Sequence, residues 1–583
     1  MITMGFWNHS ETLLPPSKLA RPWTVTRFIK LCCSCAFLVY AAFFLVANST
    51  QFPSKISTAS AHKLFSKAGR NDSIAGHLKK LTEEPHVAGT PENFATADYV
   101  YSIFQRSGLD AHYTDYEVLL TYPLSRSLSL SLPRGEVLDL KLKEQPVESD
   151  PCTLNPKVIP TFHAYSPSGN VSAQIVFANY GREEDYALLR NMGVDPKGAI
   201  VIAKYAKIYR GDIVGNAAEA GAIAVVVYSD PQDYGGNRTE GYYPHSRWLP
   251  PSGVQRGSIY GKIGDPLTPG WPSVADAERL SVDDPRIKLP SIPSIPISAE
   301  DATLIMKSLD GPLAPPHWHG ALDLPAYRLG RGPALLNFNY QSNHTIAPIR
   351  NVFGLIKGSE EPDRYVLLGN HRDAWTFGAG DPNGGTATLL ELAERLGKLL
   401  KEGWKPKRSI LLCNWDAEEY ALIGSTEWVE ENYDLLFSSA VAYLNVDVAV
   451  KGPGFAAKAT PQLDDLIQET AKEVEDTDNP GKTIYESLVS NSSVNFERLG
   501  GGGSDYAAFV QHSGIPSTDF TFGEGFPVYH SLYDNYMWMA EFGDPLFHRH
   551  VSMGTMWGLA PLCSSLQMQH FSLSTIQHMR IIS

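Results

Sequence analysis

The longest apolar run of the chain lies near its N-terminus. Leu31 to Ala47 contains no charged residue, and counting residues 28–30 extends the run to about 20 residues, enough for a helix to cross roughly 30 Å of hydrocarbon. Four basic residues and one acidic residue precede Leu31, so the positive-inside rule places residues 1–27 in the cytosol. We expect a transmembrane signal anchor over residues 28–48. A cleaved signal peptide and a buried core helix are the alternatives.

Triplets that can accept N-linked glycans are spread over the rest of the chain. Each has the pattern N-x-S/T without proline, and together they favour a glycoprotein body in a lumen or outside the cell. With the anchor, they predict a single-pass type II membrane protein of the endoplasmic reticulum, the secretory pathway or the plasma membrane. The triplets begin at Asn48, Asn71, Asn170, Asn237, Asn343 and Asn491.

The chain changes from helical to β-rich character before residue 350. Phe94 to Ser107 has apolar residues at helical spacing. A region rich in proline and glycine follows to about Ile346. Within it, residues 198–231 read as strand, helix and strand, which predicts a βαβ-like unit.

A regular α/β alternation begins at Asn351. Apolar stretches over 365–368, 409–413 and 441–446 predict buried strands, and residues 386–400 predict an amphipathic helix. Buried strands that alternate with helices are typical of a mostly parallel sheet with both faces covered. In such sheets, ligand sites form at the carboxyl ends of the strands.

The amino-acid composition limits the possible partners and metal ligands, but it says little about the fold. Of the 583 residues, 43% are hydrophobic and 19% are charged, which indicates a globular chain, and the net charge of −14 argues against a nucleic-acid partner. Three of the six cysteines lie together at 32, 33 and 35, and the other three are far apart, so no disulfide framework is evident. Any metal ligands must therefore be histidines and carboxylates.

Acids and histidines follow each predicted strand of the α/β region. Taken singly, a histidine after a strand is usually structural, and an aspartate there is usually a cap or turn residue. Together, clustered carboxylates would repel one another unless a cation bound between them, and imidazole with carboxylate suits zinc. The residues are His371 and Asp373 after the first strand, Asp381 before the helix, Glu418 and Glu419 after the second strand, Asp447 after the third, and His530 in a later loop.

The motifs around these residues resemble a known family. HRD (371–373), DPNGG (381–385), WDAEE (415–419), NVD (445–447) and YHS (529–531) resemble the di-zinc peptidases of the glutamate carboxypeptidase II and transferrin receptor group, within the M28 clan. Linking segments match as well, among them GVQRG, DPLTPGWP, EPDRYVLLG and GSTEWVEEN. The resemblance runs from the anchor to about Leu559, and plant-type members look most similar.

The resemblance implies an α/β zinc-exopeptidase fold. Its mixed, mostly parallel sheet would be interrupted by a β-rich protease-associated (apical) domain. From the resemblance we also expect the family's helical dimerisation domain to be missing and the last residues to be an atypical tail. The expected parts are a cytosolic tail over 1–27, the anchor over 28–48, the peptidase domain over 57–116 and 347–562, the apical domain over 117–346, and the tail over 563–583.

The resemblance also implies roles for the site residues. Asp373 would orient His371, and Glu418 would be the general base that takes a proton from water. Two zinc ions would share one carboxylate. His371 and Asp447 would hold one ion, Glu419 and His530 the other, and Asp381 would bridge the two.

Substrate residues are implied in the same way. Arg210 matches an arginine that clamps the C-terminal carboxylate of peptides. Tyr529, Gly503, Ser504 and Ser258 match other residues of the substrate cleft, with Ser258 in place of an asparagine.

The chain departs from the acid-selective members of the family at one wall of this cleft. Asp519 and Thr521 stand where those members carry arginines, and an acid there would repel an acidic penultimate side chain of the substrate. The sequence therefore gives no reason to expect an acidic preference at the penultimate position.

A calcium ion is a further candidate cofactor. The family holds calcium with a threonine, an aromatic residue's carbonyl and two glutamates, and oxygen ligands of this kind suit calcium. The matching residues are Thr268, Trp271, Glu427 and Glu430. An ordinary acidic helix face is the alternative.

The function that we expect is that of a membrane-anchored di-zinc metallocarboxypeptidase. It would remove C-terminal residues, with glutamate as the candidate, from peptides that have a free carboxylate. An aminopeptidase is the first alternative. A non-catalytic binding ectodomain or an impaired shortened form is the second.

Overall fold

The computed structural model describes residues 57–236, 239–491 and 496–563. The predicted anchor over 28–48, the glycan acceptors Asn48 and Asn237, and residues 564–583 of the predicted tail lie outside these ranges. Among the described residues, no helix combines the length and the apolar character that a membrane crossing needs.

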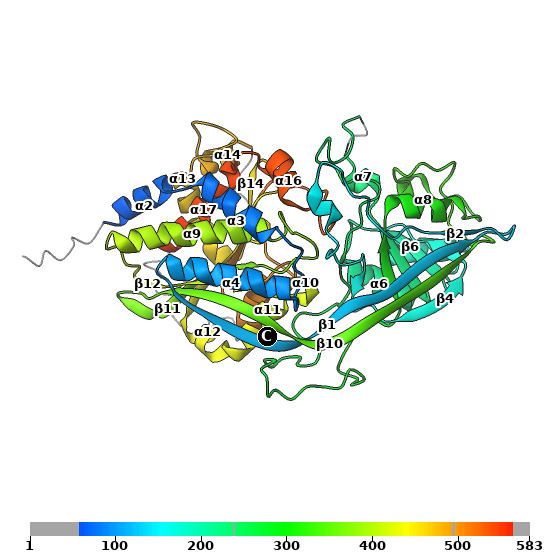
Figure 1. Cartoon of the computed structure of the whole chain (residues 1–583), viewed down its shortest axis with the longest axis horizontal. Helices are drawn as coiled ribbons and strands as arrows, with labels where there is room; N and C mark the ends of the chain where they lie inside the picture. Colours follow the sequence, from blue (N-terminus) through cyan, green and yellow to red (C-terminus); the bar gives the residue numbers. More distant parts are fainter. Residues whose placement is uncertain (1–56, 237–238, 492–495, 564–583) are drawn as a thin grey trace, which may run out of the picture. The chain divides into compact units, whose positions relative to one another are not determined.

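A large mixed sheet organises the peptidase half of the chain (Figure 1). Its strands run in the order β15-β14-β16-β13-β11-β12-β10-β1-β2, and β4 also pairs with β10. The central pairs β11/β12, β11/β13 and β13/β16 are parallel, whereas β10/β12, β1/β10 and β14/β16 are antiparallel. The strands are β1 (Asp110–Ser131), β2 (Val137–Asp139), β4 (Gly169–Ala173), β10 (Leu335–Ile356), β11 (Glu361–His371), β12 (Arg408–Trp415), β13 (Ala440–Asn445), β14 (Phe455–Ala459), β15 (Glu497–Arg498) and β16 (Ser517–Phe522).

The three central strands are buried on both faces. Leu367 of β11 packs into the core on one face, and its neighbours Val366 and Leu368 pack into the core on the other. Every residue of β12 is buried. This explains why these strands appear in the sequence as unbroken apolar runs at the predicted positions.

Helices form the two outer layers. The first layer packs with Val366 and Leu368, and the second packs with Leu367. The first consists of α2 (Thr58–Lys67), α3 (Asn71–Leu81), α4 (Pro91–Arg106), α9 (Asn383–Lys401) and α17 (His548–Leu559), and the second of α11 (Ile423–Glu431), α12 (Tyr433–Ser439) and α15 (Tyr506–Ser513). The predicted helices over 94–107 and 386–400 correspond to α4 and α9.

A second, smaller sheet forms the core of the segment between β1 and β10, which we call the insert. Its order is β5-β6-β7-β9, and all its pairs are parallel. The helix α6 connects β6 to β7, so the βαβ unit predicted over 198–231 is confirmed. The elements are β5 (Ile175–Phe177), β6 (Ile200–Lys204), α6 (Arg210–Glu219), β7 (Ala224–Tyr228) and β9 (Ser294–Ile297).

Two 22-residue strands, β1 and β10, connect the insert to the large sheet. They pair with each other almost end to end, from Asp110↔Leu355 to Ser131↔Leu335. The domain limits expected at 116/117 and 346/347 fall inside these strands, so the chain passes between the two parts without a flexible linker.

The remaining elements are short. The helices are α5 (Glu183–Asn191), α7 (Pro231–Tyr234), α8 (Ala299–Lys307), α10 (Glu418–Ala421), α13 (Asp464–Glu473), α14 (Ile484–Asn491) and α16 (Tyr536–Trp538), and the strands are β3 (His163–Ala164) and β8 (Gly257–Ser258).

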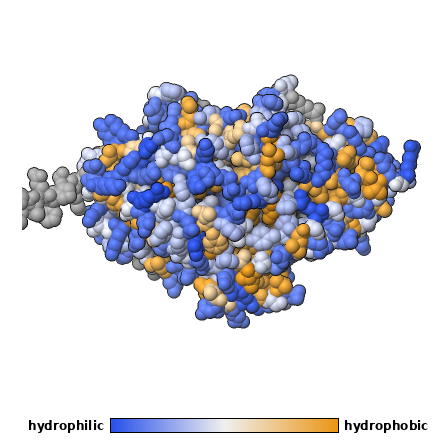
Figure 2. Space-filling model, viewed as in Figure 1, coloured by the Kyte–Doolittle hydropathy of each residue, from blue (hydrophilic) through white to orange (hydrophobic). Residues whose placement is uncertain are grey.

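Hydrophilic side chains dominate the face shown in Figure 2, with apolar residues in scattered patches, as expected for an acidic globular chain.

Candidate metal centre and active site

The carboxyl ends of β11, β12 and β13 meet at one edge of the large sheet. His371 is the last residue of β11, and Asp447 follows β13 by two residues. Glu418 and Glu419 open the short helix α10 after β12, and Asp381 precedes α9. His530 comes from the loop after β16. The structure thus brings together all five predicted metal ligands and the predicted base.

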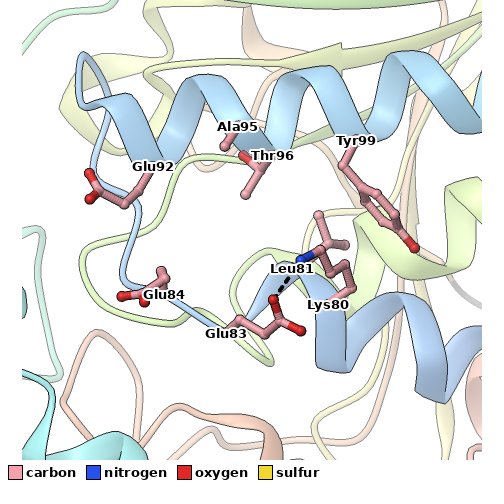
Figure 3. A pocket seen from close by; sticks show the side chains of 8 residues that line it. All are labelled: Lys80, Leu81, Glu83, Glu84, Glu92, Ala95, Thr96 and Tyr99. Atoms are coloured by element: carbon pink, nitrogen blue, oxygen red, sulfur yellow. Dashed lines mark hydrogen bonds and ion pairs between the residues drawn. The ribbon is translucent and has the colours of Figure 1, made fainter.

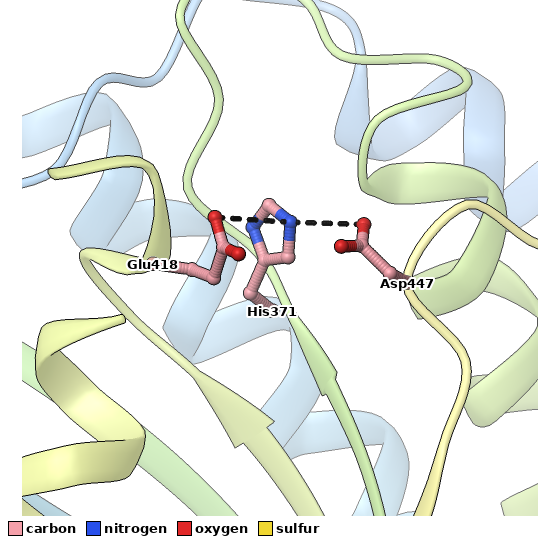
Figure 4. Close-up of side chains that lie close together, drawn as sticks. All are labelled: His371, Glu418 and Asp447. Atoms are coloured by element: carbon pink, nitrogen blue, oxygen red, sulfur yellow. Dashed lines mark hydrogen bonds and ion pairs between the residues drawn. The ribbon is translucent and has the colours of Figure 1, made fainter. Parts of the chain in front are cut away.

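The first group forms around His371 (Figure 4). Its Nε2 lies 3.1 Å from Asp447 Oδ1, 3.3 Å from Asp381 Oδ1 and 3.7 Å from Glu418 Oε2. Figure 4 shows the imidazole ring between the carboxylates of Glu418 and Asp447.

The second group forms around His530. Its Nε2 lies 3.0 Å from Glu419 Oε2 and 3.3 Å from Asp381 Oδ2. Asp381 therefore directs one carboxylate oxygen to each histidine, which is the arrangement required of a ligand shared by two metal ions.

The far side of each imidazole ring is held by a backbone carbonyl. His371 Nδ1 donates to the carbonyl of Asp373 and His530 Nδ1 donates to that of Arg256, both over 3.1 Å. Since a carbonyl only accepts, Nδ1 carries a proton in each ring, and Nε2 is the nitrogen that can give up its proton and bind a metal.

Asp373 does more than the predicted orientation of His371. Its carboxylate lies 3.6 Å from His371 Nδ1 and accepts the backbone N–H groups of Glu418 and Glu419, over 3.0 and 3.3 Å. The preceding Ala417 has a φ of +55°, in the left-handed region. Asp373 therefore fixes the turn that presents both glutamates.

Burial and hydrogen bonds shift the pKa values of these carboxylates. It raises the pKa of Glu418 well above its ordinary value, despite the opposing charge of His371, and raises that of Glu419 to about 7. Burial also raises the pKa of Asp381, but hydrogen bonds from His371 and His530 outweigh this effect and hold the pKa low.

The donor set fits divalent zinc. Two imidazoles and three carboxylates are the ligand types that zinc accepts, and bound cations would offset the cost of burying the acids together. Glu419 Oε1 is buried and has no hydrogen-bond partner, so an acceptor there is available to a metal.

The substrate residues fall into two sets. Tyr529 and Gly503 line a pocket of about 290 Å³ together with Asp381, Asp447 and Asp519. This pocket is continuous with the metal ligands, and Thr521 also lines it.

Ser504 and Ser258 are buried and do not line that pocket. The Ser504 hydroxyl accepts a hydrogen bond from Asn445 Nδ2 over 3.0 Å. Ser258, in β8, accepts one from the Tyr260 N–H over 3.2 Å. Their side chains support the walls of the site, and a direct role in binding substrate stays a prediction.

Arg210 reaches the site from the insert. Its Nη2 lies 3.4 Å from the Tyr529 hydroxyl and from His530 Nδ1. Tyr529 in turn stacks on the His530 ring, with 3.6 Å between the ring centroids. Arg210 therefore places a guanidinium beside His530 and Tyr529, next to the second group.

The predicted calcium residues also lie close together. Glu427 accepts the backbone N–H groups of Asp265 and Ser273, each over 2.7 Å, and the Thr268 hydroxyl over 3.4 Å. Trp271 N–H donates to the carbonyl of Thr268. Burial raises the pKa of Glu430 to about 7, and its Oε2 is buried without a partner.

Several supporting residues were missed in the sequence. Asp534 accepts the N–H groups of Gly380 and Asp381, over 2.7 and 3.1 Å, and so holds the loop of the shared ligand. Glu144 and Arg256 contact the loop of His530. The sequence gives a weak indication of Asp534, because it lies four residues after His530. It gives no indication of Glu144, which lies 388 residues from its partner Leu532.

Another hollow lies between α3 and α4 (Figure 3). It is small, about 110 Å³, and Lys80 pairs with Glu83 at its rim over 2.6 Å. Its lining contains carboxylates but no histidine, so it offers no comparable ligand set.

Family comparisons agree with this site. Residues 351–541 match peptidase family M28, and residues 167–260 match the PA domain. The first range contains all five predicted ligands and Glu418, and the second contains Arg210.

Curated relatives match over most of the chain. The probable glutamate carboxypeptidase LAMP1 of Arabidopsis thaliana is 54% identical over 531 residues, which cover 89% of this chain and 76% of that protein. The probable glutamate carboxypeptidase VP8 of Zea mays is 46% identical over 87% of this chain and 69% of that protein. Aminopeptidase NAALADL1 of Mus musculus is 37% identical over 83% of this chain and 69% of that protein.

Solved structures share the fold at low sequence identity. A peptidase M28 precursor from Shewanella amazonensis has a TM-score of 0.55 at 18% identity and covers 86% of this chain and 96% of its own. A zinc aminopeptidase from Bacillus subtilis has a TM-score of 0.51 at 16% identity and covers 84% and 94%. With the curated relatives, these matches show that the chain belongs to peptidase family M28, as a glutamate carboxypeptidase-like zinc exopeptidase of the plant type.

Proposed function

We propose that this chain is a di-zinc carboxypeptidase that releases the C-terminal residue of peptides. The observation that carries the direction of cleavage is the position of Arg210, whose guanidinium lies 3.4 Å from Tyr529 and His530. A guanidinium binds a carboxylate through two hydrogen bonds, so it would anchor the free C-terminus beside the metal ligands. The names of the plant relatives support the same direction.

Two zinc ions would be held by the two groups around His371 and His530, with Asp381 shared. Bound there, zinc lowers the pKa of water and polarises a carbonyl group. Glu418 would accept the proton of the attacking water and pass it to the leaving amine. Its position at the edge of the His371 group, 3.7 Å from Nε2, suits a proton acceptor better than a close ligand.

The pocket of about 290 Å³ would receive the substrate residue on the other side of the scissile bond from Arg210. Asp519 lines this pocket, and Asn445 Nδ2 donates to its carboxylate over 3.0 Å. Lys451 and Lys458 line the same pocket, so an acidic side chain there would meet opposite charges as well as a like charge. We therefore propose that the pocket neither requires nor rejects an acidic penultimate residue.

Aminopeptidase activity is the second candidate. The mouse relative and the Bacillus structure are named aminopeptidases, and Asp519 is a carboxylate that could pair with a free amine. A non-catalytic role is disfavoured, because all five ligands and Glu418 are present.

A peptide with blocked ends separates the two directions. Amidation of the C-terminus should reduce cleavage by a carboxypeptidase to a weak residual rate, and acetylation of the N-terminus should leave cleavage unchanged. Mass spectrometry of the products would identify the residue released. Loss of activity on the acetylated peptide alone would contradict the proposal and establish the aminopeptidase.

We also propose calcium as a structural ion at Thr268, Trp271, Glu427 and Glu430. The unpartnered Oε2 of Glu430 supports it. Calcium should raise the melting temperature of the wild-type chain but not that of a Glu430→Gln variant, and an equal rise in both would contradict the site.

The location of the enzyme is proposed from the sequence. The apolar run over 28–48 and the exposed triplets at Asn170 and Asn343 support a type II membrane glycoprotein with a lumenal or extracellular body. Protease protection in microsomes, with and without detergent, would test the orientation.

A further inference from the structure

His530 is held in an uncommon backbone conformation. Its φ of +57° lies in the left-handed region, which non-glycine residues rarely adopt unless their surroundings enforce it. The main chain of Arg256 supplies that support. The Arg256 N–H donates to the carbonyl of His530 over 3.2 Å, and the Arg256 carbonyl accepts from His530 Nδ1 over 3.1 Å.

These two bonds fix the ring as well as the backbone. The Arg256 carbonyl requires a proton on Nδ1, which leaves Nε2, facing Glu419 and Asp381, as the nitrogen that can bind a metal. Arg210 Nη2 also lies 3.4 Å from Nδ1, but both atoms would be donors, so the proton points to the carbonyl.

A buried ion pair anchors Arg256. Arg256 Nη1 lies 2.8 Å from Glu144 Oε2, and each side chain is only 2% exposed. The guanidinium also donates to the carbonyl of Ile159 through Nε and Nη2, over 3.2 and 3.0 Å. The Arg256 backbone therefore cannot shift without breaking a fully desolvated charge pair.

Glu144 joins both sides of this arrangement. Its Oε1 accepts the N–H of Val254, two residues before Arg256, and the N–H of Leu532, two residues after His530, each over 3.0 Å. The Glu144 carboxylate thus links the segment that contains Arg256 to the loop that contains His530. Glu144 and Arg256 both belong to the region between β1 and β10, outside the sheet that presents the other ligands.

We propose that Glu144 and Arg256 are positioning residues for His530, so that the insert sets the affinity of one of the two metal groups. The group around His530 depends on them, whereas the group around His371 is supported by Asp373 within the peptidase sheet. This inference rests on the proposed zinc centre and adds an unequal dependence of its two halves on the insert.

The variant Glu144→Gln tests the inference. Glutamine keeps the size of the side chain but has one accepting oxygen instead of two, and it leaves Arg256 without its counter-charge. We expect one of the two zinc dissociation constants to rise about 10–100-fold, as for loss of a residue that supports a metal-binding histidine, and the other to stay unchanged. Titration of the metal-depleted chain against a chromophoric chelator measures both constants without relying on activity.

Glu391→Gln is the matched control. Glu391 and Arg395 form an equally buried pair, 1% and 0% exposed, and the contacts of Glu391 to Arg70 and Arg395 involve no site residue. This variant should melt at a lower temperature and keep both zinc constants. If Glu144→Gln does not fold, Glu144 and Arg256 can be replaced together by Met, which removes the buried charges as a pair. This double variant should raise the same one of the two zinc dissociation constants.

Each result has one reading. Unchanged constants in Glu144→Gln, or an equal rise of both, would overturn the positioning role and leave the zinc centre intact. A wild-type chain that binds fewer than two zinc ions would overturn the zinc centre and this inference with it.

Discussion

Glu418 and Glu419 are adjacent in the sequence, yet they contact different histidines. Glu419 lies 3.0 Å from His530, and Glu418 lies 3.7 Å from His371. The left-handed Ala417 and the two backbone bonds to Asp373 turn the chain sharply at this point. Neighbouring acids can therefore serve as a metal ligand and as a base, each with its own surroundings.

Replacing the base should separate metal binding from catalysis. Glu418→Gln keeps the shape of the side chain but cannot accept a proton, so we expect kcat to fall about 10²–10⁴-fold. Zinc content, measured by elemental analysis, should stay at the wild-type value. A variant that retains most of its activity would remove Glu418 from this role.

Replacing the shared carboxylate should affect both metal groups at once. Asp381→Ala removes the oxygens that face His371 and His530, so we expect the loss of both zinc ions. Asp363→Ala, at an exposed position of β11, is the control and should keep its zinc. Two zinc ions retained by Asp381→Ala would contradict the bridge.

Replacing Arg210, the proposed anchor of the substrate carboxylate, should change substrate binding. A hydrogen-bonded charge contributes about 1.5–3 kcal/mol, so Arg210→Ala should raise KM for peptides with a free C-terminus roughly 10–100-fold. The same substitution should leave the weak cleavage of an amidated peptide unaffected. Equal effects on both peptides would show that Arg210 does not bind the carboxylate.

At the scale of elements, the start of α9 depends on the absence of side chains. A Cβ at Gly385 would lie 2.3 Å from Asn370 Nδ2 and from the carbonyl of Asp447. Asn370 lies at the end of β11, and Asp447 follows the end of β13. The helix can therefore approach the metal ligands only because residue 385 is glycine.

Gly385→Ala should push these strand ends apart and weaken zinc binding, and it should lower the melting temperature as well. Gly76→Ala, in α3, is the contrast, because a Cβ there meets nothing within 4 Å. It should leave zinc unchanged and be neutral or stabilising by about 0.5–1 kcal/mol. Zinc titration and thermal unfolding measure both variants. Normal zinc affinity in Gly385→Ala would contradict the close packing.

The pattern of apolar and polar residues predicted the strands and helices that are buried on both faces. It predicted the residues at which they begin and end less well. The helix expected over 386–400 extends over Asn383–Lys401, because the buried Asn383, Gly384 and Gly385 carry no helical apolar signal. The strands β1 and β10 were not anticipated as long elements. Their burial alternates irregularly along 22 residues, since each strand runs along the large sheet past different neighbours and packs against two different cores.

At the scale of the whole molecule, the site combines residues that are far apart in the chain. The strand-end rule placed His371, Glu418, Glu419 and Asp447 on one edge, and the pattern of acids and histidines added Asp381 and His530. The family resemblance added their metal roles and Arg210. Neither supplied Glu144 or the role of Arg256, because their contacts with the His530 loop span 388 and 274 residues. Such contacts depend on how the insert packs on the peptidase sheet, which periodicity does not encode.

The zinc content of the purified chain tests the central claim most directly. The two groups around His371 and His530, joined by Asp381, predict close to two zinc ions per chain by elemental analysis. Near-zero zinc in a folded chain, after growth and purification with zinc present, would contradict the di-zinc centre and the peptidase mechanism built on it.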